Sequence, residues 1–68
     1  MTREKGFGAV LKTLREEKGL TQAQLAKAAG TTQEYVAMLE TGVRKNPTIE
    51  TLKRLAKALG VPVTELLE

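Results

Sequence analysis

The stretch that decides the fold is TQAQLAKAAGTTQEYVAMLETG, residues 21–42. Thr21 and Gln24 at its start have the T-x-x-Q spacing at which each side chain accepts a hydrogen bond from a backbone N–H that a helix start leaves unsatisfied. Leu20 before this cap and Leu25 after it have the spacing of a hydrophobic contact that fixes how the chain enters the helix. A short helix is therefore predicted after Thr21, and Gly30 ends it.

Another helix is predicted immediately afterwards, with Thr31 or Thr32 as its cap, and it continues to about Thr41. Only Gly30 and one or two threonines separate the two helices. A connection this short that contains glycine is typical of a helix-turn-helix. The sequence thus predicts a helix-turn-helix over about residues 21–41.

The chain on either side of this unit also has apolar residues at helical spacing, and no segment alternates with period two. A first helix is predicted from Phe7 to about Lys18. Beyond residue 42, Pro47 disfavours helix in the preceding loop, and Thr48 caps a fourth helix. The residues that this fourth helix is expected to turn toward the core are Ile49, Leu52, Leu55, Ala56 and Leu59.

A last helical turn is predicted from Val63 to Leu67, after Gly60 and Pro62. Its apolar side chains either close the core or form a dimer contact. The predicted fold class is therefore all-α, with five helices in one compact domain over residues 1–68.

The composition excludes most catalytic and metal-binding chemistry. With no Cys and no His, the chain has no thiolate or imidazole for zinc and no Ser-His or Cys-His pair. Asp is absent as well, so acid–base catalysis would rest on lone Glu side chains. No apolar run is long enough for a membrane span, and no signal-peptide pattern follows Met1. We expect a cytoplasmic binding module that is not an enzyme and uses no cofactor or metal.

The third predicted helix has a polar face. Tyr35, Val36 and Leu39 share its inward side, and the opposite side carries Gln33, Glu34, Ala37, Met38 and Thr41. Gln can pair with adenine, Glu can accept from cytosine, and a methyl-bearing side chain can contact thymine. The same face is equally compatible with a helix that is merely solvated. The net charge of +3 fits a polyanionic partner but is a weak signal.

Residues 15–42, REEKGLTQAQLAKAAGTTQEYVAMLETG, and 46–67, NPTIETLKRLAKALGVPVTELL, resemble the Xre-type, lambda-repressor-like helix-turn-helix family. The resemblance lies in the order and spacing of L-T-Q-x-x-L-A, the glycine turn and T-L-x-x-L-A-x-A-L-G-V, and it covers nearly the whole chain. It implies five α-helices and sequence-specific binding of double-stranded DNA through the third helix. It also implies a transcriptional regulator, usually a homodimer on a palindromic operator.

The family resemblance also implies roles for individual residues. The base-reading residues would be Gln33, Glu34, Ala37 and Met38. The phosphate-binding residues would be Thr21, Gln22, Thr32, Tyr35, Thr41, Arg44, Lys45 and Asn46. Gln22 would also brace the first base-reading residue, and Arg15 with Glu40 would form an internal ion pair.

Alternatives remain open at this point. A protein-interaction module of the same fold, such as an antitoxin-like or assembly domain, would bind a protein and not DNA. An N-terminal arm of about residues 1–6, with Arg3 and Lys5, either reaches DNA or is unordered. The remaining basic side chains of the helices are expected to be solvated, namely Lys12, Lys18, Lys53, Arg54 and Lys57.

Overall fold

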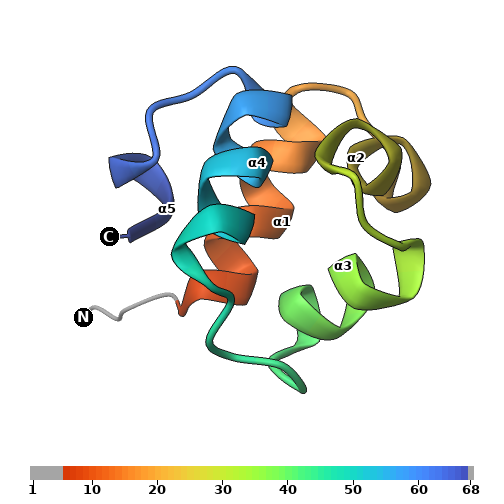
Figure 1. Ribbon diagram of the computed structural model, residues 1–68. Coiled ribbons are helices and arrows are strands. Elements are labelled where there is room, and N and C mark those ends of the chain that lie inside the picture. Colours follow the sequence, from red (N-terminus) through yellow and green to blue (C-terminus); the bar gives the residue numbers. More distant parts are fainter. Residues whose placement is uncertain (1–5, 68) are drawn as a thin grey trace.

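The computed structural model describes residues 6–67, and within them the chain forms five helices (Figure 1). Their bounds are α1 (Phe7–Glu17), α2 (Gln22–Ala29), α3 (Gln33–Thr41), α4 (Ile49–Leu59) and α5 (Thr64–Leu67). The all-α, five-helix prediction is confirmed. Arg3 and Lys5 of the predicted arm lie outside the described residues.

The helix starts follow from side-chain caps. The Thr21 backbone N–H donates to Gln24 Oε1 at 2.8 Å, and the Gln24 N–H donates to Thr21 Oγ1 at 3.0 Å, as the T-x-x-Q spacing predicts. Thr32, and not Thr31, caps α3 by accepting from the Tyr35 N–H. Thr48 caps α4 in the same way. Each cap satisfies a backbone donor that the helix leaves free, so the boundaries are set locally.

The turn between α2 and α3 depends on Gly30. Its φ of +73° lies in the left-handed region, where a residue with a Cβ is strained. The next residue, Thr31, then donates its N–H to the carbonyl oxygen of Ala26 at 2.9 Å, which closes the end of α2. The chain thereby changes direction within three residues, and α3 packs against α2.

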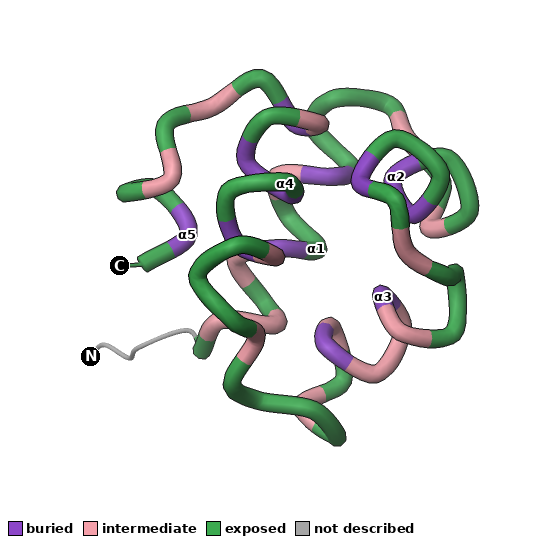
Figure 2. The backbone as a smooth tube through the Cα atoms, in the orientation of Figure 1, coloured by how far each residue is buried: buried purple, intermediate pink, exposed green. Residues whose placement is uncertain are grey.

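Buried residues from all five helices form the core, and Figure 2 shows the buried segments facing one another between the helices. Leucines from four helices are almost completely buried, together with Val36: Leu11, Leu25, Leu39, Leu55 and Leu59. α3 packs against α1 and α2, whereas α5 packs against α1 and α4 on the opposite side of the molecule (Figure 1). The outer face of α3 is therefore left uncovered by the rest of the fold.

Two apolar residues that were considered for the core are exposed. Ile49 was expected in the core stripe of α4, but 63% of its surface is exposed, so that expectation is wrong. The residue stands at the edge of the stripe and in the first turn of α4, where no other helix reaches over it. In α5, Leu66 is buried while 58% of the surface of Leu67 is exposed, so only the first of these leucines closes the core.

Candidate nucleic-acid interface

The outer face of α3 begins with two fully accessible polar side chains. Gln33 and Glu34 are exposed in the first turn, and Ala37 and Met38 are half-buried in the second. On the opposite side, Val36 and Leu39 are buried in the core, which fixes the rotation of the helix about its axis. The burial of one side therefore presents the predicted base-reading residues together on the other.

The loop after α3 is held against the helix. The Arg44 N–H donates to the carbonyl oxygen of Met38 at 3.1 Å, and the Arg44 Cζ lies 5.4 Å from the centre of the Tyr35 ring. A guanidinium at this distance from an aromatic face is attracted by the ring. Thr41 is exposed next to this contact, and its hydroxyl donates to the carbonyl oxygen of Met38 at 3.3 Å. Arg44, Lys45 and Asn46 are all exposed, so this loop offers two cations and an amide beside the outer face of α3.

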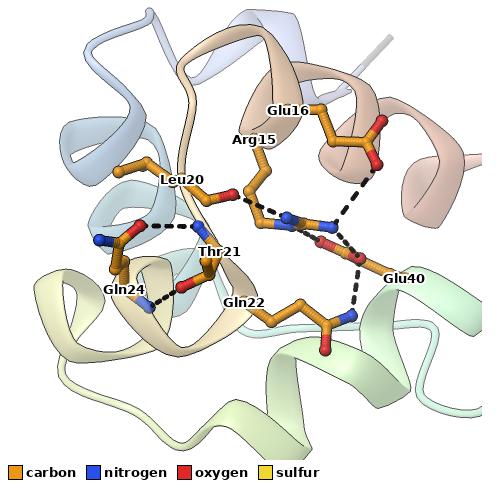
Figure 3. Close-up of polar contacts among 7 residues, drawn as sticks. All are labelled: Arg15, Glu16, Leu20, Thr21, Gln22, Gln24 and Glu40. Carbon is orange, nitrogen blue, oxygen red and sulfur yellow. Dashed lines mark hydrogen bonds and ion pairs between the residues drawn. The ribbon is translucent and has the colours of Figure 1, made fainter.

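The start of α2 provides a second polar edge. Thr21 is exposed, and its hydroxyl oxygen accepts from the Gln24 N–H. Gln22 is half-buried, and its Nε2 donates to Glu40 Oε1 at 3.0 Å (Figure 3). Within residues 6–67, the side-chain hydrogen bond found for Gln22 goes to Glu40 and not to Gln33, the residue that it was expected to brace. The free N–H groups at this helix start, with the helix dipole, favour a phosphate.

Beneath these residues, the structure brings Arg15 and Glu40 together (Figure 3). Arg15 Nε donates to Glu40 Oε2 at 2.6 Å, and Nη2 donates to Oε1 at 3.1 Å. The third nitrogen, Nη1, donates to the carbonyl oxygen of Leu20 at 2.7 Å. Only 10% of the Arg15 side chain and 2% of the Glu40 side chain are exposed. The pair ties α1, the turn before α2, and the end of α3 to one another.

The hydrogen bond that Arg15 donates to Glu40 raises the pKa of Arg15 above its ordinary value, and this effect outweighs the lowering caused by burial. A basic group with a raised pKa contributes its full stabilisation at every pH below its ordinary pKa. Because arginine is already protonated throughout the accessible pH range, the Arg15 guanidinium stays charged under all conditions in which the protein would be handled.

Sequence reasoning missed Gly8. A Cβ built at this position would lie 2.6 Å from the Glu40 carbonyl oxygen and would overlap the Leu39 carbonyl oxygen. The backbone of α1 therefore touches the last turn of α3 directly, which places α3 close to the core. The available signal was a glycine among the apolar residues of the first helical turn, where glycine costs stability unless a close approach requires it.

The described part of the chain contains no group of three acidic side chains that could hold a metal ion. Between residues 6 and 67, no helix is both long enough and apolar enough to cross a membrane. The exposed polar groups of α3, the α3–α4 loop and the α2 N-terminus are thus the chemistry that this face offers. They form the candidate interface.

Comparison with known proteins agrees with this geometry. A helix-turn-helix family model matches residues 11–66, which is most of the chain. The chain belongs to this helix-turn-helix family. The Xre-type resemblance seen in the sequence is thereby confirmed. The curated relatives include transcriptional regulators and phage control proteins.

Three similar proteins illustrate the match. The uncharacterized HTH-type transcriptional regulator y4dJ of Sinorhizobium fredii is 46% identical over 98% of this chain and 86% of its own length. The restriction-modification controller protein C.AhdI of Aeromonas hydrophila is 40% identical with a TM-score of 0.84, covering 88% of this chain and 89% of its own. The biofilm regulator SinR in complex with DNA is 34% identical with a TM-score of 0.87, covering 91% and 98%. Three further curated relatives, SlrR, DdrOP3 and RghR, are longer, and the chain spans less than half of their length.

Proposed function

We propose that this helix-turn-helix chain is a sequence-specific regulator that reads double-stranded DNA by inserting α3 into the major groove. The observation that carries the proposal is the uncovered polar face of α3, which has the α2 N-terminus and the Arg44–Asn46 loop beside it. An α-helix fits the major groove, and the N-terminal residues of a recognition helix contact the base edges. The existence of a DNA complex of the similar protein SinR supports this assignment.

In this arrangement the two polar edges contact the sugar-phosphate backbone and α3 contacts the bases. The register of the protein on the duplex would be set by phosphate contacts from the α2 start and from Thr32, Tyr35, Thr41, Arg44, Lys45 and Asn46. Gln33 and Glu34 would discriminate among bases, and Ala37 and Met38 would contact thymine methyl groups. Glu34 lowers affinity for any polyanion, but it also rejects bases that offer it no donor.

Replacing Gln33 by Ala should relax base preference, whereas replacing Lys45 by Ala should weaken binding to every sequence. A good base contact is worth about 1–3 kcal/mol of discrimination. The logarithm of the association constant falls linearly with the logarithm of the salt concentration. Loss of one phosphate contact should make this slope shallower by about 1. Duplexes selected from a random pool, and random duplex of equal length, would be titrated by fluorescence anisotropy at several salt concentrations.

The matched control is Lys57→Ala, which removes an equally exposed cation at the far end of α4. This variant should keep the salt slope of the parent protein. Equal losses on selected and random duplex for Gln33→Ala would refute base reading by that residue. Salt-independent binding, or none, would leave the protein-interaction module as the better description.

We further propose that the chain acts as a homodimer on a palindromic operator. Exposed Leu67 borders a groove of about 240 Å³, which is lined by the apolar Phe7, Pro47 and Leu52 and also by Lys45 and Asn46. A second copy would cover the apolar part around Leu67 by a two-fold contact and leave Lys45 and Asn46 to DNA. The protomer measures 35 × 23 × 23 Å, a size compatible with the spacing of about 34 Å between recognition helices on adjacent turns of DNA.

Replacing Leu67 by Glu should abolish this association without unfolding the protein, because the side chain is already exposed. Sedimentation velocity should show dimers of the parent protein and monomers of the variant. Ile49→Glu is the matched control, since Ile49 is equally exposed but does not line the groove. A parent protein that stays monomeric on a palindromic duplex would contradict the dimer.

A further inference from the structure

The buried carboxylate of Glu40 accepts a third hydrogen bond besides the two from Arg15. Its Oε1 accepts both from Arg15 Nη2 at 3.1 Å and from Gln22 Nε2 at 3.0 Å. Gln22 is the first residue of α2 and belongs to the candidate interface, whereas Arg15 and Glu40 lie below it. The network thus connects a buried ion pair to a half-buried residue of the interface (Figure 3).

The chemistry of this contact determines how the Gln22 amide is turned. An ionised carboxylate can only accept hydrogen bonds, and the amide of Gln has a donor end and an acceptor end. The nitrogen of Gln22 must therefore face Glu40, and its oxygen points away (Figure 3). The carbonyl oxygen and the second N–H are left for other partners. The hydrogen bond is charge-assisted, so it holds this orientation more firmly than a neutral acceptor would.

We propose that Glu40, held by Arg15, is a positioning residue that orders the Gln22 side chain for DNA before DNA binds. The proposal rests on the DNA-binding function proposed above. A free glutamine side chain must be immobilised when the complex forms, and its amide can present either end. Restraint by Glu40 removes the entropic cost of ordering this side chain when DNA binds. The second N–H of the Gln22 amide can then donate to a phosphate oxygen, whereas its carbonyl oxygen can accept only from a base amino group or a protein N–H.

A double-mutant cycle separates this role from a structural one. Glu40→Gln, Gln22→Ala and their combination would be titrated against the duplex enriched from a random pool, and the fraction folded would be measured in each case. In the parent background, Glu40→Gln should weaken binding about 2- to 10-fold, the cost of ordering one side chain. In the Gln22→Ala background, the same change should have no further effect on affinity, while its effect on stability persists.

The control for charge is Glu17→Gln, which alters the net charge equally at an exposed position of α1. The change in affinity that it causes is subtracted from that of Glu40→Gln. In the unbound protein, the side-chain NH₂ signals of Gln22 should shift in Glu40→Gln and stay unchanged in Glu17→Gln.

A second route covers the case in which Glu40→Gln does not fold. The double variant Arg15→Met/Glu40→Leu replaces the ion pair by apolar side chains, a change that proteins tolerate. Glu40→Gln leaves a neutral amide oxygen near Gln22, whereas this double variant removes the acceptor altogether. It should bind DNA about 2- to 10-fold more weakly, again only when Gln22 is present. Equal losses with and without Gln22 would overturn the positioning role and leave the proposed function intact. Failure of the parent protein to bind any duplex would overturn both.

Discussion

Replacing Arg15 by Ala should lower the free energy of unfolding by about 3–5 kcal/mol, because Glu40 is left charged and without its main partner in the interior. In a domain of this size, each kcal/mol lowers the melting temperature by roughly 4–8 °C. The total stability of such a domain is about 5–15 kcal/mol, so this single change removes much of it. Thermal and urea unfolding followed by circular dichroism would measure the loss.

The control is again Arg15→Met/Glu40→Leu, which removes both charges together. Buried ion pairs contribute little net stability relative to well-packed apolar side chains, so this variant should recover most of what Arg15→Ala loses. A second comparison is Arg54→Ala, which breaks the exposed pair with Glu50 and should cost about 0–1 kcal/mol. If Arg15→Ala and Arg54→Ala unfolded at the same temperature and the same urea concentration, the interior pair would not hold the helices together.

Replacing Gly8 by Ala should destabilise the protein by about 1–3 kcal/mol, although Ala is intrinsically the better helix former by about 1 kcal/mol. The added Cβ would meet the carbonyl oxygens of Leu39 and Glu40, which are backbone atoms and cannot rotate away. Relief is possible only if α3 moves away from α1, and the movement would displace Gln33 and Glu34 as well. Unfolding in urea would report the stability, and anisotropy with the selected duplex would report DNA affinity of the folded protein.

Gly6→Ser is the matched control at the same end of α1. A Cβ at Gly6 meets nothing within 4 Å, and Ser is a favourable residue at this N-cap position. This variant should be as stable as the parent protein or slightly more stable. A Gly8→Ala variant with unchanged stability and affinity would show that α3 does not depend on the close approach of α1.

Much of the fold was predictable because its signals are local. The T-x-x-Q cap, the threonine caps of α3 and α4, and the closing glycines each act within a few residues, and the structure shows them as expected. The apolar period of α3 likewise predicted that Val36 and Leu39 turn inward. The expectation for Ile49 was wrong because periodicity states which side of a helix is apolar, not how far along that helix the core extends.

The candidate interface was predictable only in part. The helical period alone placed Gln33 and Glu34 on the outer face of α3, while the family resemblance suggested Arg15 and Glu40 as partners. Neither indicated that Gln22 would donate to Glu40, because these residues belong to different helices and are 18 positions apart in the chain.

The sequence by itself determined, to within a residue or so, where each helix starts and stops, and it determined which side of α3 is polar, since caps and periodicity depend on neighbours along the chain. Only the tertiary structure decided how close α1 comes to α3 at Gly8, and which way the Gln22 amide faces. Both depend on atoms that are distant in sequence and meet only when the helices pack, and no local pattern encodes such a distance.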